Sequence, residues 1–173
     1  MIRLTRSASS SHAAAKLEGA SVFLRPPQTD DWPRWAEVRA ESRYFLTPWE
    51  PTWPPDALTE GAYMRRIRRL ATEWKTDEGY SFHVFQRERG YLVGGIGLTQ
   101  VKRGVAQTAT LGYWVGEPYQ RRGYTTDAVR TIVRFGFQQL KLHRIEAACL
   151  PENIASRRVL EKAGFVREGY ARL

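Results

Sequence analysis

The run Gln120-Arg121-Arg122-Gly123-Tyr124-Thr125 combines residue types that can bind a phosphate group. An apolar segment ends near Val115 before it, and apolar residues at helical spacing follow it. The first turn of a helix presents unpaired backbone N–H groups and a partial positive charge, which favour an anion. Gly123 has no Cβ, so the backbone can approach the anion closely, and the arginines add positive charge. The run predicts a pyrophosphate-binding loop; an arginine-rich loop that only begins a helix is the alternative.

The segments after this loop are predicted from their hydrophobic periodicity. From Ala128 to Leu140 the apolar residues recur at helical spacing. We expect a buried strand over residues 142–150, then a second helix from Pro151-Glu152-Asn153 to Gly164, because glycine favours a helix end. Phe165-Val166 is expected to begin a last strand before the sequence ends at Leu173.

Before the loop, most of the regular segments have the pattern of strands. Runs of alternating or continuous apolar residues predict strands over residues 21–25, 81–85, 91–98 and 109–115. The last three are expected to form an antiparallel sheet. The glycines at positions 94, 95 and 97 lie inside one of these runs, and no helix opens after them. We interpret them as close-packed strand backbone rather than as a nucleotide-binding loop.

The remaining segments before the sheet are a tail, two helices and a loop. Residues 1–18 are rich in Ser and Ala and predict a flexible tail. Asp30 and Asp31 are expected to cap a first helix, and residues 56–75 predict a basic amphipathic helix. Four prolines between Phe45 and Pro55 exclude a long regular element there. That loop carries Trp49 and Trp53, which are interpreted either as a wall of a substrate site or as a hydrophobic plug.

Composition narrows the class of protein. The 173 residues are enough for one domain, and no apolar stretch is long enough to span a membrane. The net charge of +9 suggests a phosphate-bearing partner, but the arginine pairs are scattered and no nucleic-acid-binding motif is present, so specific nucleic-acid recognition is not expected. The single cysteine, Cys149, excludes an internal disulfide and a four-cysteine zinc site, and we expect no metal and a cytoplasmic location.

Several motifs in order carry a resemblance to a known family. They are Gly112-Tyr113-Trp114-Val115, Arg122-Gly123-Tyr124, His143-Arg144-Ile145-Glu146-Ala147, the segment from Asn153 to Phe165 with Ser156 in its Asn-x-x-Ser start, and Glu168-Gly169. This set resembles the GNAT superfamily of N-acetyltransferases, and within it the ribosomal-protein-alanine N-acetyltransferase branch. The resemblance runs from about Ser21 to the end of the sequence.

The resemblance implies an α/β fold. It would be a single domain over residues 19–173, with a mixed, mostly antiparallel central sheet flanked by helices. Two central strands would splay apart and admit the pantetheine arm of acetyl-coenzyme A (acetyl-CoA). The family usually continues with a final C-terminal strand, which we expect to be missing from this chain because the sequence stops at Leu173.

The resemblance also implies roles for particular residues. Backbone groups of Trp114, Val115 and Gly116 would bind the pantetheine arm and polarise the thioester carbonyl. Residues Gln120 to Thr125 would hold the pyrophosphate, although the motif usually ends in Gly or Ala and this chain has Thr125. Asn153 would contact the pantetheine, or would only cap its helix. Ser156 would lie near the sulfur.

The implied chemistry is direct attack of a neutral amine on the acetyl thioester, without an acyl-enzyme. Many family members have a tyrosine four residues before the glycine that here is Gly164, but this chain has Leu160 there. Ser156 is therefore the candidate catalytic residue, as an acid or by orienting the sulfur. No general base is assigned; Glu117 and His143 are weak candidates, and Cys149 is interpreted as a core residue.

The acceptor stays open at this point. The leading hypothesis is the N-terminal α-amine of a protein such as a ribosomal protein. The alternatives are a small amine, such as an aminoglycoside or polyamine, and a non-catalytic module that binds an acyl-CoA. A basic RNA-associated protein is a further alternative, which steep salt dependence of RNA binding would reveal.

Overall fold

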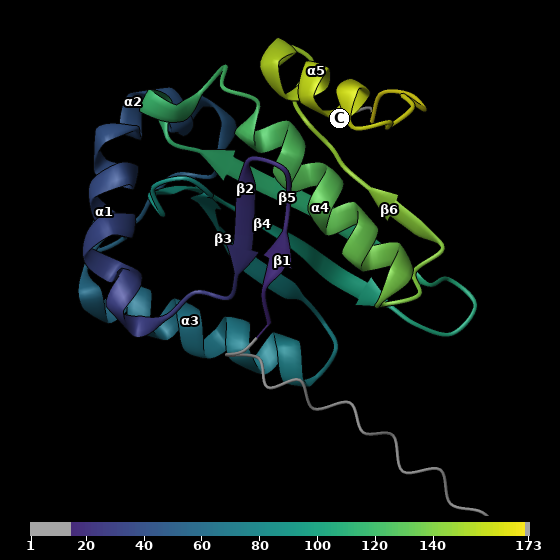
Figure 1. Cartoon of the computed structure of the whole chain (residues 1–173), viewed down its shortest axis with the longest axis horizontal. Helices are drawn as coiled ribbons and strands as arrows, with labels where there is room; N and C mark the ends of the chain where they lie inside the picture. The colour runs from purple at the N-terminus through teal and green to yellow at the C-terminus, as the bar shows by residue number, and fades with distance from the viewer. Residues whose placement is uncertain (1–14, 172–173) are drawn as a thin grey trace, which may run out of the picture.

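A six-stranded sheet forms the centre of the computed structural model, which describes residues 15–171 (Figure 1). The strands follow one another across the sheet in chain order, antiparallel from β1 to β5, and only β5 and β6 pair in parallel. Their bounds are β1 Leu17–Glu18, β2 Val22–Arg25, β3 Tyr80–Gln86, β4 Leu92–Lys102, β5 Thr108–Val115 and β6 Arg144–Glu146. The predicted mixed, mostly antiparallel sheet is confirmed.

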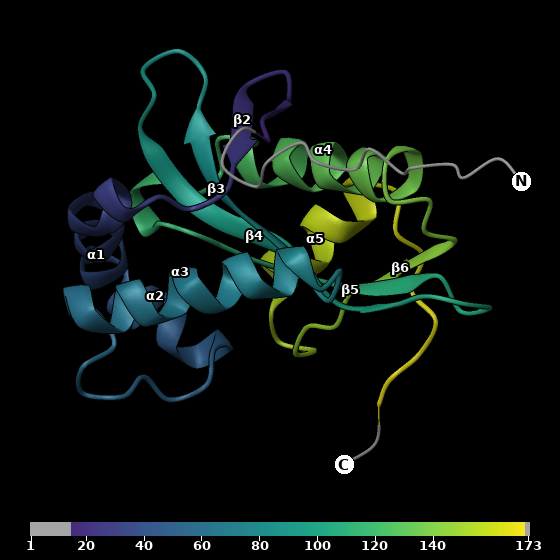
Figure 2. The same cartoon turned by 90° about the horizontal axis from the view of Figure 1, so that it is seen from below.

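Helices cover both faces of this sheet (Figures 1 and 2). Their bounds are α1 Trp32–Glu41, α2 Arg43–Leu46, α3 Glu60–Lys75, α4 Tyr124–Gln138 and α5 Ile154–Lys162. Because side chains alternate along a strand, Val84 packs in the core beneath α4, whereas the next residue, Phe85, packs on the other face beside Trp35 of α1 and Tyr63 of α3. Within residues 15–171, no helix is long and apolar enough to cross a membrane.

Several predicted elements have different bounds in the structure. The strand predicted over residues 142–150 is only three residues long in β6, and residues 165–171 form no regular element, so the last strand predicted at Phe165-Val166 was wrong. The predicted tail also overlaps the sheet, because Leu17 and Glu18 pair with β2; residues 1–14 of that tail, and Leu173, lie outside the described residues. Strands need a neighbour that supplies hydrogen bonds, and the pairing of β6 with β5 ends at Glu146.

The loop over residues 45–55 contains only short pieces of helix, as its prolines predict. α2 runs into a 3-10 turn over Thr47–Trp49, and no regular strand or helix follows before α3. The helix predicted from residue 56 begins at Glu60, because Thr59 is its N-cap and its hydroxyl accepts a hydrogen bond from the Ala62 N–H at 3.3 Å.

Asp31 occupies the N-cap position of α1, as predicted, but its side chain makes no capping hydrogen bond to that helix and joins a buried cluster. Its carboxylate accepts two hydrogen bonds from the Arg25 guanidinium, at 2.7 and 2.6 Å, and one from the Gln28 N–H at 2.8 Å. The His83 ring, 3% exposed, places Nδ1 3.2 Å from the same carboxylate. Burial opposes ionisation of Asp31, but the hydrogen bonds from Arg25 and His83 outweigh it and lower the pKa of the carboxyl. Burial also lowers the pKa of His83, although Asp31 opposes this.

This cluster predicts that the fold is sensitive to acid. Both folded-state pKa values lie below their unfolded values, so the unfolded chain binds more protons as the pH falls. The stabilisation is present at neutral pH; the His83 contribution is lost below about pH 6.5 and the Asp31 contribution below about pH 3.9. Urea unfolding between pH 8 and 3 will show a steady fall in the free energy of unfolding. His83→Gln will flatten the upper part of this profile; an unchanged upper part would contradict the assignment to His83.

Glycines allow neighbouring groups of β3 and β5 to approach the backbone of β4 closely. A Cβ added at Gly94 would lie 2.3 Å from the backbone oxygen of Trp114, and one at Gly95 would lie 2.4 Å from Nε1 of the Trp114 ring. A Cβ at Gly97 would lie 3.0 Å from Oγ of Ser81. These contacts confirm the interpretation of the three glycines as close-packed strand backbone.

We predict that Gly94→Ala destabilises the protein, because the new methyl group meets backbone that cannot move without parting the two strands. The expected loss is about 1–3 kcal/mol of the free energy of unfolding, measured by urea titration. Gly112→Ala on β5 is the matched control, because a Cβ there meets nothing within 4 Å. Equal effects of the two substitutions would show that close packing at Gly94 is not the cause.

Candidate active site

The pairing of β5 with β6 ends after the third residue pair, and we call the unpaired stretch that follows the gap. The pairing runs from Thr108 with Arg144 to Thr110 with Glu146 and then stops. The Gln107 carbonyl accepts a hydrogen bond from the His143 N–H at 2.7 Å, which places the backbone groups of odd-numbered β5 residues on the side of β6. Beyond Thr110 the odd-numbered residues therefore face the gap.

Backbone groups of successive β5 residues point alternately to β4 and to the gap. This alternation divides the three residues that were predicted to bind the cofactor through their backbone. The Gly116 N–H donates to the Val93 carbonyl at 2.9 Å, so even-numbered residues, Trp114 included, direct their backbone groups to β4. The Gly116 N–H is thus used inside the sheet. Val115, together with Tyr113, directs its backbone N–H and C=O groups into the gap.

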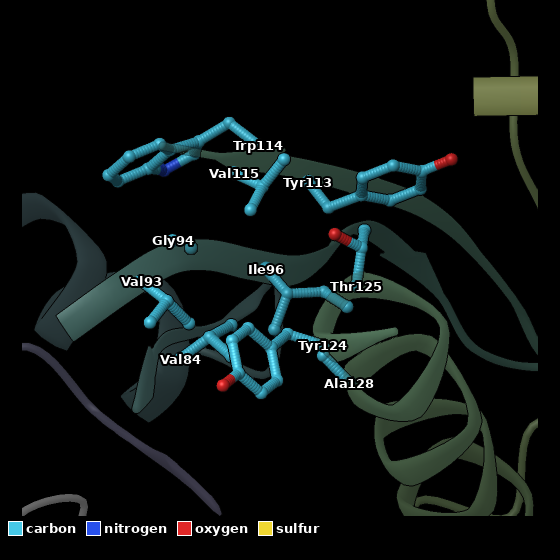
Figure 3. A pocket seen from close by; sticks show the side chains of 11 residues that line it. Val84, Val93, Gly94, Ile96, Tyr113, Trp114, Val115, Tyr124, Thr125 and Ala128 are labelled. Atoms are coloured by element: carbon cyan, nitrogen blue, oxygen red, sulfur yellow. The ribbon is translucent and has the colours of Figure 1, made fainter. Parts of the chain in front are cut away.

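A small apolar hollow lies beside this part of β5, between the sheet and the start of α4 (Figure 3). Its interior is about 10 Å³, space for a single water molecule, so it is too small to hold a whole substrate. The residues that line it are Val84, Val93, Gly94, Gly95, Ile96, Tyr113, Trp114, Val115, Tyr124, Thr125 and Ala128. Four of the residues predicted to bind the cofactor therefore meet here: Trp114, Val115, Tyr124 and Thr125.

The predicted phosphate loop is an exposed turn that leads into α4. Gly123 immediately precedes the helix with φ +81°, a left-handed conformation that glycine adopts easily. Gln120, Arg121 and Arg122 are exposed. Among the described residues no side chain caps α4, and its first backbone hydrogen bond runs from the Asp127 N–H to the Gly123 carbonyl. The N–H groups of the preceding helical residues have no helical partner and are available to an anion.

Contacts on both sides hold this loop in place. Before it, the Glu117 N–H donates to Oγ of Ser42 at 2.9 Å, and the Arg34 guanidinium donates to the Tyr119 hydroxyl at 2.6 Å. After it, the Asp127 carboxylate accepts hydrogen bonds from the Ser21 N–H at 2.7 Å and from neighbouring groups of the β2 start. Burial opposes ionisation of Asp127, but these bonds lower the pKa of its carboxyl overall. Its negative charge is thus stabilised by the N–H groups at the strand start.

The first turn of α5 provides a further set of polar groups. Oδ1 of Asn153 accepts a hydrogen bond from the Ser156 N–H at 2.9 Å, which confirms the helix-capping interpretation of Asn153. Oγ of Ser156 lies 2.8 Å from the Tyr113 hydroxyl, and that hydroxyl is also 3.2 Å from the Ser156 carbonyl oxygen. Burial raises the pKa of Tyr113, and the nearby Cys149 thiol raises it further. The hydrogen bond to Ser156 lowers it, but by less.

Tyr113 was not among the residues predicted from the sequence to act in the site. Two signals were available: its place inside the Gly112-Tyr113-Trp114-Val115 motif, and its position one residue from Trp114, which puts its side chain on the opposite face of the strand. Its contact with Ser156 joins residues 43 positions apart, which no local pattern reveals.

On the other face of β5, Trp114 packs against a cluster built around Arg39. The Arg39 guanidinium lies over the Trp114 ring at 4.8 Å and over the Trp53 ring at 4.3 Å from the ring centres. It donates two hydrogen bonds to the Glu50 carboxylate, at 2.9 and 2.6 Å, and Nε1 of Trp53 donates to the same carboxylate at 2.8 Å. The proline-rich loop is thereby attached to the strand that borders the gap. Trp49 remains 40% exposed.

The side chains of the remaining polar candidates show no catalytic arrangement among the described residues. His143 and Glu117 are exposed, and Cys149 is partly buried in a segment without regular structure, not in a strand as predicted. It packs against the main core, which agrees with its interpretation as a core residue. Over residues 15–171, no three His, Cys, Asp or Glu side chains are grouped so that they could hold a metal ion.

Comparison with known proteins agrees with this geometry. Residues 21–166 match the model of the acetyltransferase (GNAT) domain family. The chain is 37% identical to a probable N-acetyltransferase, YjcK, of Bacillus subtilis over 90% of its own length and 86% of that protein. It is 30% identical to the ribosomal protein uS5-alanine N-acetyltransferase of Escherichia coli, over 83% of its own length and 73% of that protein.

Solved structures give the same result. The chain superposes on Mycobacterium smegmatis RimJ, solved in complex with CoA-disulfide, with a TM-score of 0.82 and 30% identity, over 90% of this chain and 76% of that one. The family match spans most of the chain, and the relatives carry both the fold and the named activity. The chain belongs to the GNAT acetyltransferase family and is an acetyl-CoA-dependent N-acetyltransferase.

Proposed function

We propose that this enzyme acetylates the N-terminal α-amine of a protein by direct attack of the amine on acetyl-CoA. The observation that carries the proposal is the gap between β5 and β6, with the uncapped start of α4 at one wall and Ser156 at another. The E. coli relative is named for acetylating an alanine of ribosomal protein uS5, which supports the choice of acceptor.

The cofactor would occupy the gap with its pyrophosphate on the start of α4. The pyrophosphate would accept hydrogen bonds from backbone N–H groups of the loop from Gln120 to Thr125, and Arg121 and Arg122 would add charge. The pantetheine amides would pair with the backbone of Tyr113 and Val115, as a short extra strand would. Trp114 and Gly116, whose backbone groups face β4, would support this edge rather than contact the arm.

The reaction would need no covalent intermediate on the enzyme. The neutral amine attacks the carbonyl carbon of the thioester, the C–N bond forms, and the C–S bond breaks with its electron pair moving to the sulfur. Ser156 would stabilise the negative sulfur from the first turn of α5, where the helix dipole also favours negative charge. Asn153, which caps that turn, would fix the direction of the serine.

The charges around Trp53 favour a peptide acceptor over a polycation. Arg39 and Arg43 both lie over the Trp53 ring, at 4.3 and 5.4 Å, and Glu50 neutralises only the first of them by direct contact. An aminoglycoside or polyamine carries several positive charges and would be repelled here, whereas a peptide terminus followed by acidic residues would not.

We predict that Gly123→Ala weakens acetyl-CoA binding about tenfold, because a side chain at φ +81° strains the loop and crowds the anion. Isothermal titration calorimetry with acetyl-CoA measures this. Gly164→Ala is the matched control, since Gly164 also has a positive φ (+95°) but ends α5 instead of beginning α4. Equal losses of affinity in both variants would contradict a pyrophosphate site at Gly123.

We predict that the enzyme acetylates peptides with an N-terminal alanine and acidic residues after it faster than spermidine. Arg43→Glu will shift this preference about fivefold towards spermidine, because it reverses a charge beside the acceptor. Arg89→Glu makes the same change of net charge at an exposed turn and should leave the preference unaltered. Release of free thiol reports turnover. Preference of the native enzyme for spermidine would contradict a peptide acceptor, and binding of acetyl-CoA without thiol release from any amine would indicate a non-catalytic module.

A further inference from the structure

The Tyr113 and Ser156 side chains meet across the gap that would hold the cofactor arm. Tyr113 projects from β5, whose pairing with β6 has ended three residues earlier, at Thr110. Ser156 projects from the first turn of α5, and the two oxygens lie 2.8 Å apart. Tyr113 also lines the apolar hollow beside Thr125 (Figure 3). A thioester carried into the gap would bring its sulfur close to this pair.

Each of the two hydroxyl groups carries one hydrogen atom, so only two hydrogen-bond arrangements of the pair need to be considered. If Ser156 donates to the tyrosine oxygen, the serine hydrogen is used and the tyrosine donates to the Ser156 carbonyl, 3.2 Å away. If the tyrosine donates to Oγ of Ser156 instead, the serine hydrogen is free to point elsewhere. A negative sulfur in the gap selects the second arrangement, because only then does the serine donate to it. The chain of two hydrogen bonds also polarises the serine hydroxyl.

Relative acidities indicate that both hydroxyls keep their protons. A thiol ordinarily titrates near pH 8.5 and a tyrosine near pH 10. Burial raises the pKa of Tyr113 further, and an alkyl hydroxyl is a weaker acid still. Transfer of either proton to the thiolate is therefore uphill. The C–S bond therefore breaks with the sulfur leaving as a thiolate, which accepts the serine hydrogen bond. The sulfur later takes a proton from solvent, and the acetylated amine loses a proton to solvent.

We propose that Tyr113 is a positioning residue: by donating to Oγ of Ser156, it turns the serine hydroxyl towards the sulfur of the departing CoA. This inference rests on the proposed function, because it requires the thioester to lie in the gap. The Tyr113 side chain would thus act on the leaving group through Ser156, whereas its backbone lines the gap.

Steady-state kinetics provide the first test. Tyr113→Phe keeps the ring and removes only the hydroxyl; we expect kcat to fall about tenfold, the effect of one hydrogen bond to developing charge, with KM for acetyl-CoA little changed. Ser156→Ala should reduce kcat about 10- to 100-fold. The double variant should be no slower than Ser156→Ala alone, because Tyr113 acts through the serine. Tyr170→Phe, at a tyrosine that is 63% exposed, is the matched control.

Binding of the product provides a second test that does not depend on turnover. If the pair stabilises a thiolate, the affinity of native enzyme for CoA rises with pH below the ordinary pKa of the thiol, whereas the affinity for desulfo-CoA, which has no thiol, does not. In Tyr113→Phe and Ser156→Ala this rise should move to higher pH, towards the pKa of free CoA. Binding of desulfo-CoA should stay the same in all variants, which shows that each variant is folded.

The outcomes separate this inference from the proposed function. If Ser156→Ala slows transfer and Tyr113→Phe matches native enzyme in both tests, the positioning role is wrong and the acetyl-transfer proposal stands. If Tyr113→Phe binds CoA more tightly and turns over faster, the pair is a barrier to the cofactor, which also overturns the inference. If neither substitution affects turnover or CoA binding while native enzyme turns over, the thioester does not lie against this pair, and the proposed placement of the cofactor in the gap fails with the inference, although acetyl transfer itself stands.

Discussion

The parting of β5 from β6 is the constraint on which the site depends. A strand that leaves its neighbour exposes backbone groups that must be hydrogen-bonded or solvated. On β5 these groups belong to Tyr113 and Val115, because the pairing ends at Thr110 and the alternation is set by the contact of Gly116 with Val93. The other edge of β5 is held tightly to β4 by the glycines there. β5 is thus fixed on one side and open on the other, which is the arrangement that a ligand with amide groups can complete.

The two helix starts beside the gap differ in the way their first turns are satisfied. The start of α5 is capped by its own Asn153, whereas the start of α4 follows an exposed glycine and has no side-chain cap among residues 15–171. The acidic residue nearest the open start, Asp127, directs its carboxylate to the backbone of β2. The positive end of α4 is therefore left for an external anion, and α5 is left to orient side chains.

Local patterns in the sequence were sufficient for the parts of the fold that local physics determines. The turn before α4 and the close-packed strand backbone at the glycines of β4 were predicted because each follows from residue type, spacing and periodicity. The strand predicted at Phe165-Val166 did not form, because an apolar run becomes a strand only where a neighbour pairs with it. The contacts of Tyr113 with Ser156 and of Arg39 with Glu50 join distant positions, and a single sequence carries no signal for their pairing.

The Arg39 cluster shows how the two sides of the site are coupled. Its members come from α1, from the proline-rich loop and from β5, so that a loop which is far from β5 in the sequence is linked to Trp114 through Arg39. A largely buried ion pair adds little net stability, because desolvation offsets its attraction, but its fixed hydrogen-bond geometry specifies one arrangement of the groups around it. The loop that borders the proposed acceptor is therefore held in register with the strand that borders the proposed cofactor. A shift of the loop would disturb the packing of Arg39 on Trp114, which is the neighbour of Tyr113 on β5.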